Sequence, residues 1–105
     1  MKKMPQYDVI VSDRAQHMLG IHVRFLAGAS PSAARRVKVE IMKVIRSLST
    51  MPQRFSFLNE EYIPSNKYHK VFVENNYLVL YQIKNQTVYV DYIVDTQQDY
   101  SWLIK

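Results

Sequence analysis

The side chains best suited to chemistry in this chain stand close together around His69, between Lys67 and Lys70. An imidazole has an unperturbed pKa of about 6.5, so His69 can accept or donate a proton near neutral pH. Metal-free cleavage of RNA needs such a proton-transfer group together with positive charge on the phosphate, which the two lysines would supply. The alternative is that His69 is an ordinary strand histidine and that both lysines are simply solvated.

Other chemistries find little support in the sequence. Cysteine is absent, which excludes disulfides, thiolate metal sites and thiol nucleophiles. His17 and His22 are five residues apart, whereas paired metal ligands on a helix favour a spacing of four, and we interpret His22 as a packed histidine. The only glycines are Gly20 and Gly28, so there is no glycine-rich phosphate loop. We therefore expect neither a metal nor a cofactor.

Positive charge is concentrated in residues 31–50, within a chain whose formal net charge is +5. Against the single acid Glu40, this segment carries Arg35, Arg36, Lys38, Lys43 and Arg46. One face of the molecule should then be positive and suited to RNA, DNA or an acidic protein. The alternative is a solvated helix face that binds nothing.

The length of 105 residues predicts a single domain spanning residues 1–105. Near the N-terminus, the basic residues 1–3 are followed only by the short apolar run Val9–Val11, which Ser12 interrupts. A signal peptide needs an apolar stretch of about 7–15 residues and a membrane span needs about 20. We expect a cytoplasmic protein that does not enter the membrane.

The hydrophobic pattern predicts elements in the order β-α-α-β-β-β-α. Strands are expected at residues 7–11, 68–74, 77–84 and 87–94, helices at 13–28, at 31–50 and in a short final segment 96–104, and a loop at 51–66. Ser12 and Ser30 are placed to cap the first two helices, and Gly28 to end the first. The two long helices should pair as an antiparallel hairpin, because only a few residues separate them.

Apolar stripes give the faces that these elements should bury. In the first helix the stripe is Ala15, Met18, Leu19, His22, Phe25 and Leu26, and in the second it is Ala34, Val37, Ile41, Val44, Ile45 and Leu48. In the last strand, Val88, Val90, Tyr92 and Val94 alternate with Tyr89, Asp91 and Ile93. The fold class is α+β, with helices packed on a largely antiparallel four-stranded sheet. Asp91 needs solvent or a cationic partner.

Several short motifs occur in order from residue 68 onward. Tyr68–Lys70 reads Tyr-His-Lys, Asn75–Asn76 forms a turn, Tyr77–Tyr81 has the pattern Tyr-x-x-x-Tyr, and Gln98–Tyr100 reads Gln-Asp-Tyr. This series resembles the RelE/ParE superfamily of bacterial toxins, with its Tyr-Arg-Lys strand, Gly-Asn or Asn-Asn turn, Tyr-x-x-x-Tyr strand and Arg-Asp-Tyr ending. The resemblance covers residues 68–100 in sequence and nearly the whole chain in the order of its elements.

The resemblance implies the toxin of a type II toxin–antitoxin pair, with a cognate acidic antitoxin as partner. Toxins of this superfamily either cut mRNA on the ribosome or, in the ParE branch, poison DNA gyrase without chemistry of their own. For an mRNA interferase, the catalytic residues implied are His69, Lys70 and Tyr100. The residues expected to contact nucleic acid or antitoxin are Lys67, Arg35, Arg36, Lys43 and Arg46.

The chain departs from the superfamily where RNA-cleaving members carry cations. His69 and Leu78 stand at two such positions, Tyr92 replaces a common arginine, and Gln97–Gln98 replaces a basic pair. Our first expectation is ribosome-dependent mRNA cleavage, slightly ahead of gyrase inhibition. The other classes considered are a degenerate toxin that only binds its antitoxin and a stand-alone nucleic-acid binder.

Overall fold

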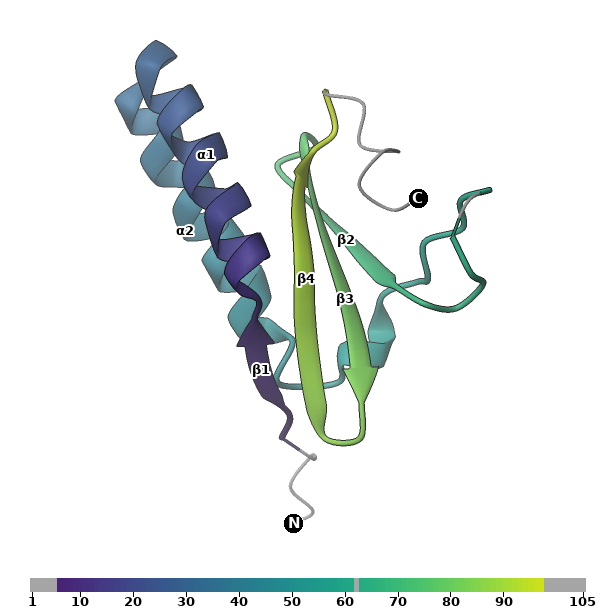
Figure 1. Ribbon diagram of the computed structural model, residues 1–105. Coiled ribbons are helices and arrows are strands. Elements are labelled where there is room, and N and C mark those ends of the chain that lie inside the picture. The colour runs from purple at the N-terminus through teal and green to yellow at the C-terminus, as the bar shows by residue number, and fades with distance from the viewer. Residues whose placement is uncertain (1–5, 62, 98–105) are drawn as a thin grey trace.

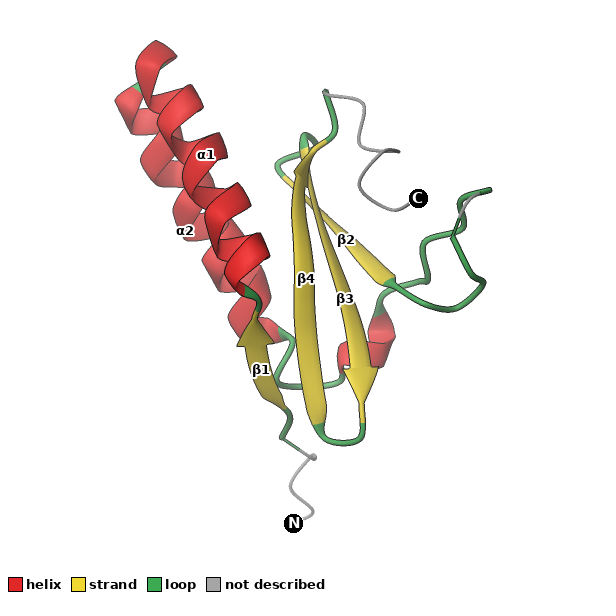
Figure 2. Cartoon of the chain, viewed as in Figure 1, coloured by secondary structure: helices red, strands yellow, loops and turns green. Residues whose placement is uncertain are grey.

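The structure is a computed structural model that describes residues 6–61 and 63–97. In chain order its elements are β1 (Asp8–Val11), α1 (Asp13–Ala29), α2 (Pro31–Ser47), the 3₁₀ turn η1 (Pro52–Arg54), β2 (His69–Val73), β3 (Tyr77–Lys84) and β4 (Thr87–Asp95). Two helices lie side by side against the sheet (Figures 1 and 2). The final helix predicted for residues 96–104 lies largely outside the described residues.

The sheet has the strand order β1-β4-β3-β2. Two hairpins join β2, β3 and β4 in antiparallel pairs, whereas β1 runs parallel to β4, with Val9 opposite Val88. Asparagine supplies the left-handed conformation that tight hairpin turns need, with φ of 63° at Asn75 and 56° at Asn85. The predicted α+β class with a largely antiparallel four-stranded sheet is therefore confirmed.

Both predicted N-caps are present. The hydroxyl of Ser12 accepts from the amide of Ala15 at 3.0 Å, and that of Ser30 accepts from the amide of Ala33 at 3.2 Å. The predicted end of α1 at Gly28 is wrong, because the helix continues to Ala29. Ser30 has an extended backbone and serves as the last cap of α1 and the first cap of α2, so the junction requires no left-handed glycine.

The helical hairpin covers one face of the sheet and forms the larger apolar cluster with it. This cluster joins buried residues of α2, such as Val37 and Ile41, to inward-facing residues of all three antiparallel strands. The predicted stripe of α2 is confirmed, but that of α1 is wrong at Phe25, whose side chain is 76% exposed. No helix within the described parts of the chain is long and apolar enough to cross a membrane.

A β-bulge at Asp91 changes the face on which the rest of β4 lies. Leu80 pairs with Tyr92 while Tyr81 pairs with Val90, so Asp91 has no residue opposite it. The predicted alternation is therefore wrong beyond Val90, because Tyr92 joins the smaller cluster on the far face of the sheet. The members of that smaller cluster are Leu58, Ile63, Tyr68, Leu78, Leu80, Tyr92 and Val94.

Candidate functional site

His69 lies at the edge of the helix-covered face, where its ring is enclosed on both sides. The imidazole stacks on the rings of Phe57 and Tyr81, with centroid distances of 4.1 and 5.2 Å. Its Nδ1 atom is hydrogen-bonded to the carbonyl oxygen of Phe55 at 2.7 Å, and the side chain is only 8% exposed. The residues before β2 fix this arrangement, because the amide of Lys70 donates to the carbonyl of Ser56 at 3.0 Å.

The structure does not bring His69 and Lys70 together, although both were predicted for catalysis. His69 and Lys70 are consecutive in β2, and successive side chains of a strand point to opposite faces. His69 therefore faces the helix-covered side, whereas Lys70 lies half-buried on the other side. Lys67 is also on that other side, where its exposed side chain places Nζ 5.4 Å from the centroid of the Tyr68 ring. The predicted catalytic Tyr100 lies outside the described residues.

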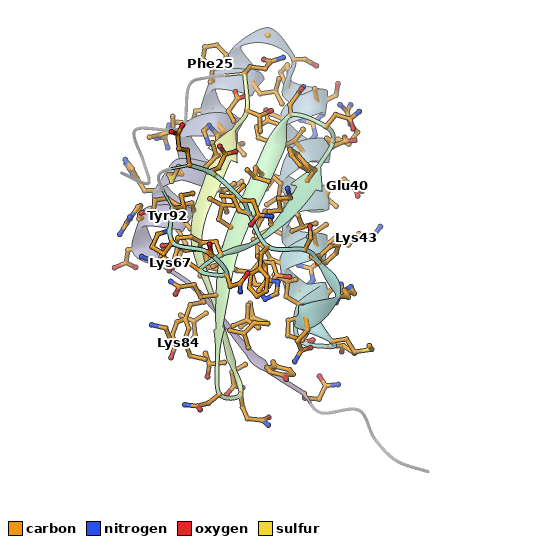
Figure 3. The ribbon with its side chains drawn as sticks, turned by 90° about the vertical axis from the view of Figure 1, so that its right-hand side faces the viewer. Phe25, Glu40, Lys43, Lys67, Lys84 and Tyr92 are labelled. Carbon is orange, nitrogen blue, oxygen red and sulfur yellow. The ribbon has the colours of Figure 1, made fainter. Side chains whose placement is uncertain are left out.

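On the face of the sheet away from the helices, apolar and aromatic packing occupies the positions where RNA-cleaving relatives would carry cations. Leu78 is fully buried, and Tyr92 packs edge-on against Tyr68 at 5.8 Å. Burial, followed by the charge of Asp91, raises the pKa of Tyr68 to about 12. Figure 3 shows Tyr92 and Lys67 on this side of the molecule. The phenol of Tyr68 is therefore a neutral packing group near neutral pH.

Sequence reasoning missed one cation on this face and misjudged one carboxylate. The guanidinium of Arg14 lies 4.6 Å from the centroid of the Tyr92 ring and donates to the Tyr92 hydroxyl. The sequence does indicate that Arg14 lies near this face, because Arg14 is one helical turn before Met18, which packs on the smaller cluster. Asp91 accepts from the amide nitrogen of Gln82 at 2.6 Å instead of pairing with a cation.

The positive surface predicted on α2 is exposed, but its cations are not equivalent. Nε of Arg36 lies 2.6 Å from Oε1 of Glu74, and this ion pair connects α2 to the β2–β3 turn. Lys43 lies 4.0 Å from Glu40 within the helix. Arg35 and Arg46 form no ion pair within the described residues, and their spacing of eleven places them on one side of α2. Their charges are therefore available to a partner.

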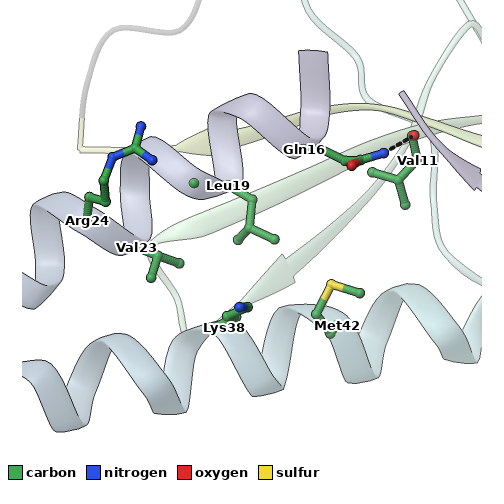
Figure 4. Close-up of a pocket in the computed structure, with 8 residues that line it drawn as sticks. Val11, Gln16, Leu19, Val23, Arg24, Lys38 and Met42 are labelled. Carbon is green, nitrogen blue, oxygen red and sulfur yellow. Dashed lines mark hydrogen bonds between the residues drawn. The ribbon is translucent and has the colours of Figure 1, made fainter. Parts of the chain in front are cut away.

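A groove of about 600 Å³ runs between α1 and α2 and was not anticipated from the sequence. Its lining is Val11, Gln16, Leu19, Gly20, Val23, Arg24, Lys38 and Met42. Figure 4 shows apolar side chains from both helices pointing into it, with Arg24 on α1 and Lys38 on α2. Both cations are exposed, whereas the apolar residues are half-buried. The groove thus combines an apolar floor with a positive rim.

The described residues contain no cluster of three histidine or acidic side chains that could hold a metal ion. The molecule is a small α+β protein with a helical hairpin on one face of a mixed sheet, and its surface carries the interhelical groove and the exposed cations of α2.

Comparisons with known proteins assign this architecture to a family. A solved chain described as "Chromosomal ParDE TA system from P. aeruginosa" superimposes with a TM-score of 0.69 at 11% sequence identity. The match covers 86% of this chain and 96% of that one, and at this identity it concerns the fold. The model of the family described as the ParE toxin of the type II toxin-antitoxin system, parDE, matches residues 9–100. A search of curated proteins gave no match.

The chain belongs to the ParE toxin family of type II toxin–antitoxin systems. The superfamily resemblance seen in residues 68–100 is thereby confirmed. The match begins within β1 and continues beyond β4, so it includes the helical hairpin, whose sequence carries no distinctive motif.

Proposed function

We propose that the protein is the toxin of a type II toxin–antitoxin module and that it disables its target by binding, without cutting RNA. The observation that carries this proposal is the separation of His69 and Lys70 on opposite faces of β2. The target we propose is DNA gyrase, which the resemblance to the ParE branch implies. Membership of the ParE family supports this choice over mRNA cleavage.

The surroundings of His69 argue against general acid–base catalysis. A catalytic base must come within about 2.6–3.2 Å of the proton that it removes. The Nδ1 atom is already hydrogen-bonded to the Phe55 carbonyl, and aromatic rings cover both faces of the imidazole. The side chain is also only 8% exposed, so little of the imidazole is open to a phosphodiester. On the opposite face lie the cations Arg14, Lys67 and Lys70, but His69 points away from them, and buried Leu78 and Tyr92 add no charge for a phosphorane.

The groove between α1 and α2 supports the proposed binding of an acidic antitoxin. Apolar side chains from both helices would bury the apolar face of an incoming segment, as in helix-in-groove recognition. Arg24 and Lys38 on the rim, with Arg35 and Arg46 further along α2, would then meet carboxylates of that segment. Opposite charges at such a rim raise the association rate and select the correct partner.

Growth and target assays test the proposal together. Induced expression of the toxin in bacteria should arrest growth, and co-expression of its antitoxin should restore it. The purified toxin should inhibit supercoiling by gyrase, with the toxin–antitoxin complex as the inactive control. Primer extension on ribosome-bound mRNA should reveal no toxin-dependent cuts. Cuts made by the parent and lost in a folded His69→Ala variant would overturn the proposal in favour of RNA cleavage.

A further inference from the structure

We propose that Gly20 determines the partner specificity of the interhelical groove by admitting one large apolar side chain of the antitoxin beside Arg24. The inference rests on the proposed binding of the antitoxin to this groove. Gly20 lies within α1 and lines the groove together with the half-buried side chains of Leu19, Val23 and Met42. A residue without a side chain at this point leaves an open space beside Arg24, which we call the notch.

Neither the helix nor the core requires a glycine at this position. The chain has no glycine with a positive φ, so another residue could adopt the backbone conformation of Gly20. A glycine inside a helix also lowers its stability relative to alanine. A methyl group built on Gly20 would lie 3.5 Å from Nη1 of Arg24 and, apart from residues 19 and 21 and the backbone of its own helix, within 4 Å of no other atom. The space before Gly20 is therefore bordered by Arg24 and otherwise open.

The side chains that line the rest of the groove specify what the notch would accept. Leu19, Val23 and Met42 favour a leucine- or phenylalanine-like group, because burying such a side chain removes apolar surface from water on both partners. Arg24 beside the notch and Lys38 across the groove favour carboxylates about one helical turn from that group. The predicted occupant is an amphipathic helix of the antitoxin with one large apolar residue flanked by Asp or Glu.

Gly28 provides a matched control. It is the other glycine of α1, a methyl group built on it would meet no atom within 4 Å, and it does not line the groove. Methionine at either position therefore adds the same side chain to the same helix. Only the methionine at position 20 would occupy the notch.

The experiment compares Gly20→Met and Gly28→Met toxins by titration calorimetry with the antitoxin whose co-expression restores growth. Filling a packed interface position typically costs enough to weaken binding by about 10–100-fold, which is the expected loss for Gly20→Met. Gly28→Met should bind like the parent. Circular dichroism and thermal unfolding of each free toxin check that both variants fold.

A size swap in the antitoxin extends the test. Truncating the antitoxin residue that fills the notch to alanine should weaken binding to the parent toxin and improve binding to Gly20→Met. Equal affinity of folded Gly20→Met and Gly28→Met for the antitoxin would overturn the role of Gly20 while leaving the proposed antitoxin binding intact. Failure of the parent toxin to bind the antitoxin would overturn both.

Discussion

Tyr81 lies at the centre of the packing that fixes His69. Its side chain is fully buried, and its hydroxyl donates to the carbonyl of Pro52 at 2.6 Å. Burial raises the pKa of Tyr81 to about 12, although the nearby charge of Arg54 opposes the shift. An unfolded tyrosine ionises near pH 10, so alkaline pH favours the unfolded chain. The stability that comes from this raised pKa is complete below pH 10 and is lost as the pH rises toward 12.

Substitution of Tyr81 should reveal this dependence. At pH 8, Tyr81→Phe should lower the free energy of unfolding by about 1 kcal/mol, because it removes a buried hydrogen bond. At pH 11 the parent should lose about 1.4 kcal/mol through Tyr81, whereas the variant has no phenol to ionise there. The difference between the two proteins should therefore nearly vanish at pH 11. Urea unfolding at both pH values measures it, and a difference that is constant with pH would contradict the burial argument.

At the site, the positions of some residues could be predicted from the sequence and those of others could not. The buried place of His22 was predicted from the stripe of α1, and its Nε2 is bonded to the carbonyl of Ile93 at 2.8 Å. Proximity of His69 and Lys70 in sequence suggested a common site, yet strand geometry separates neighbouring side chains. The contact of Arg14 with Tyr92 joins residues 78 positions apart, so its position one turn before Met18 indicated its face but not its partner.

At the scale of elements, Arg54 secures the C-terminal end of α2. The last carbonyls of a helix have no partner within it. Nη1 of Arg54 donates to the carbonyl of Ser47, the last residue of α2, at 3.4 Å, and to the carbonyls of Thr50 and Met51 just beyond the helix at 2.5 and 3.0 Å. Nη2 donates to the hydroxyl of Ser47 at 2.9 Å. Its guanidinium also lies 4.5 Å from the centroid of the Phe55 ring. One side chain thus joins the end of α2 to the segment that leads toward His69.

Arg54→Met should therefore destabilise the fold while keeping most of the aliphatic stem. Charge-assisted hydrogen bonds contribute about 1.5–3 kcal/mol each when buried, and partial exposure here reduces the expected loss to about 1–2 kcal/mol. Arg35→Met is the matched control, since Arg35 is exposed on the same helix and should change stability by less than about 0.5 kcal/mol. Equal unfolding midpoints in urea for the two variants would show that Arg54 does not support the helix end.

The elements themselves were largely predictable, because each repeats a local signal. Serine caps and apolar spacing located both helices, and asparagine turns located the hairpins. The bulge at Asp91 was not predictable, since an alternating pattern carries no mark of the extra residue that breaks it. Phe25 was assigned to the core for a similar reason, because helical spacing cannot tell how far a sheet extends beneath a helix.

For the whole molecule, the distribution of charge decides how the toxin should meet its antitoxin. Arg35 and Arg46 are free of ion pairs within the described residues, whereas Arg36 is held by Glu74 and also supports the fold. Arg35→Glu combined with Arg46→Glu should weaken the complex, mainly by slowing association, because attraction becomes repulsion.

The effect of this charge reversal should depend on salt. Screening shortens the range of exposed charges to about 8 Å at physiological ionic strength and about 3 Å at 1 M. The difference in affinity between parent and variant should therefore shrink as salt is added during surface plasmon resonance. An affinity for the antitoxin that is unchanged by the substitutions at low salt would show that this side of α2 is only solvated.

The pairing of β1 with β4 has a consequence for the newborn chain. Ser12, at the end of β1, donates to the carbonyl of Asp91, 79 residues later. The helical hairpin is held by contacts between residues that are close in sequence, so it can form early. The pairing of β1 with β4 can form only after β4 has been translated. At about 5–20 residues per second, this wait lasts on the order of 4–16 s. This interval gives an antitoxin that is already present time to meet the hairpin before the sheet closes.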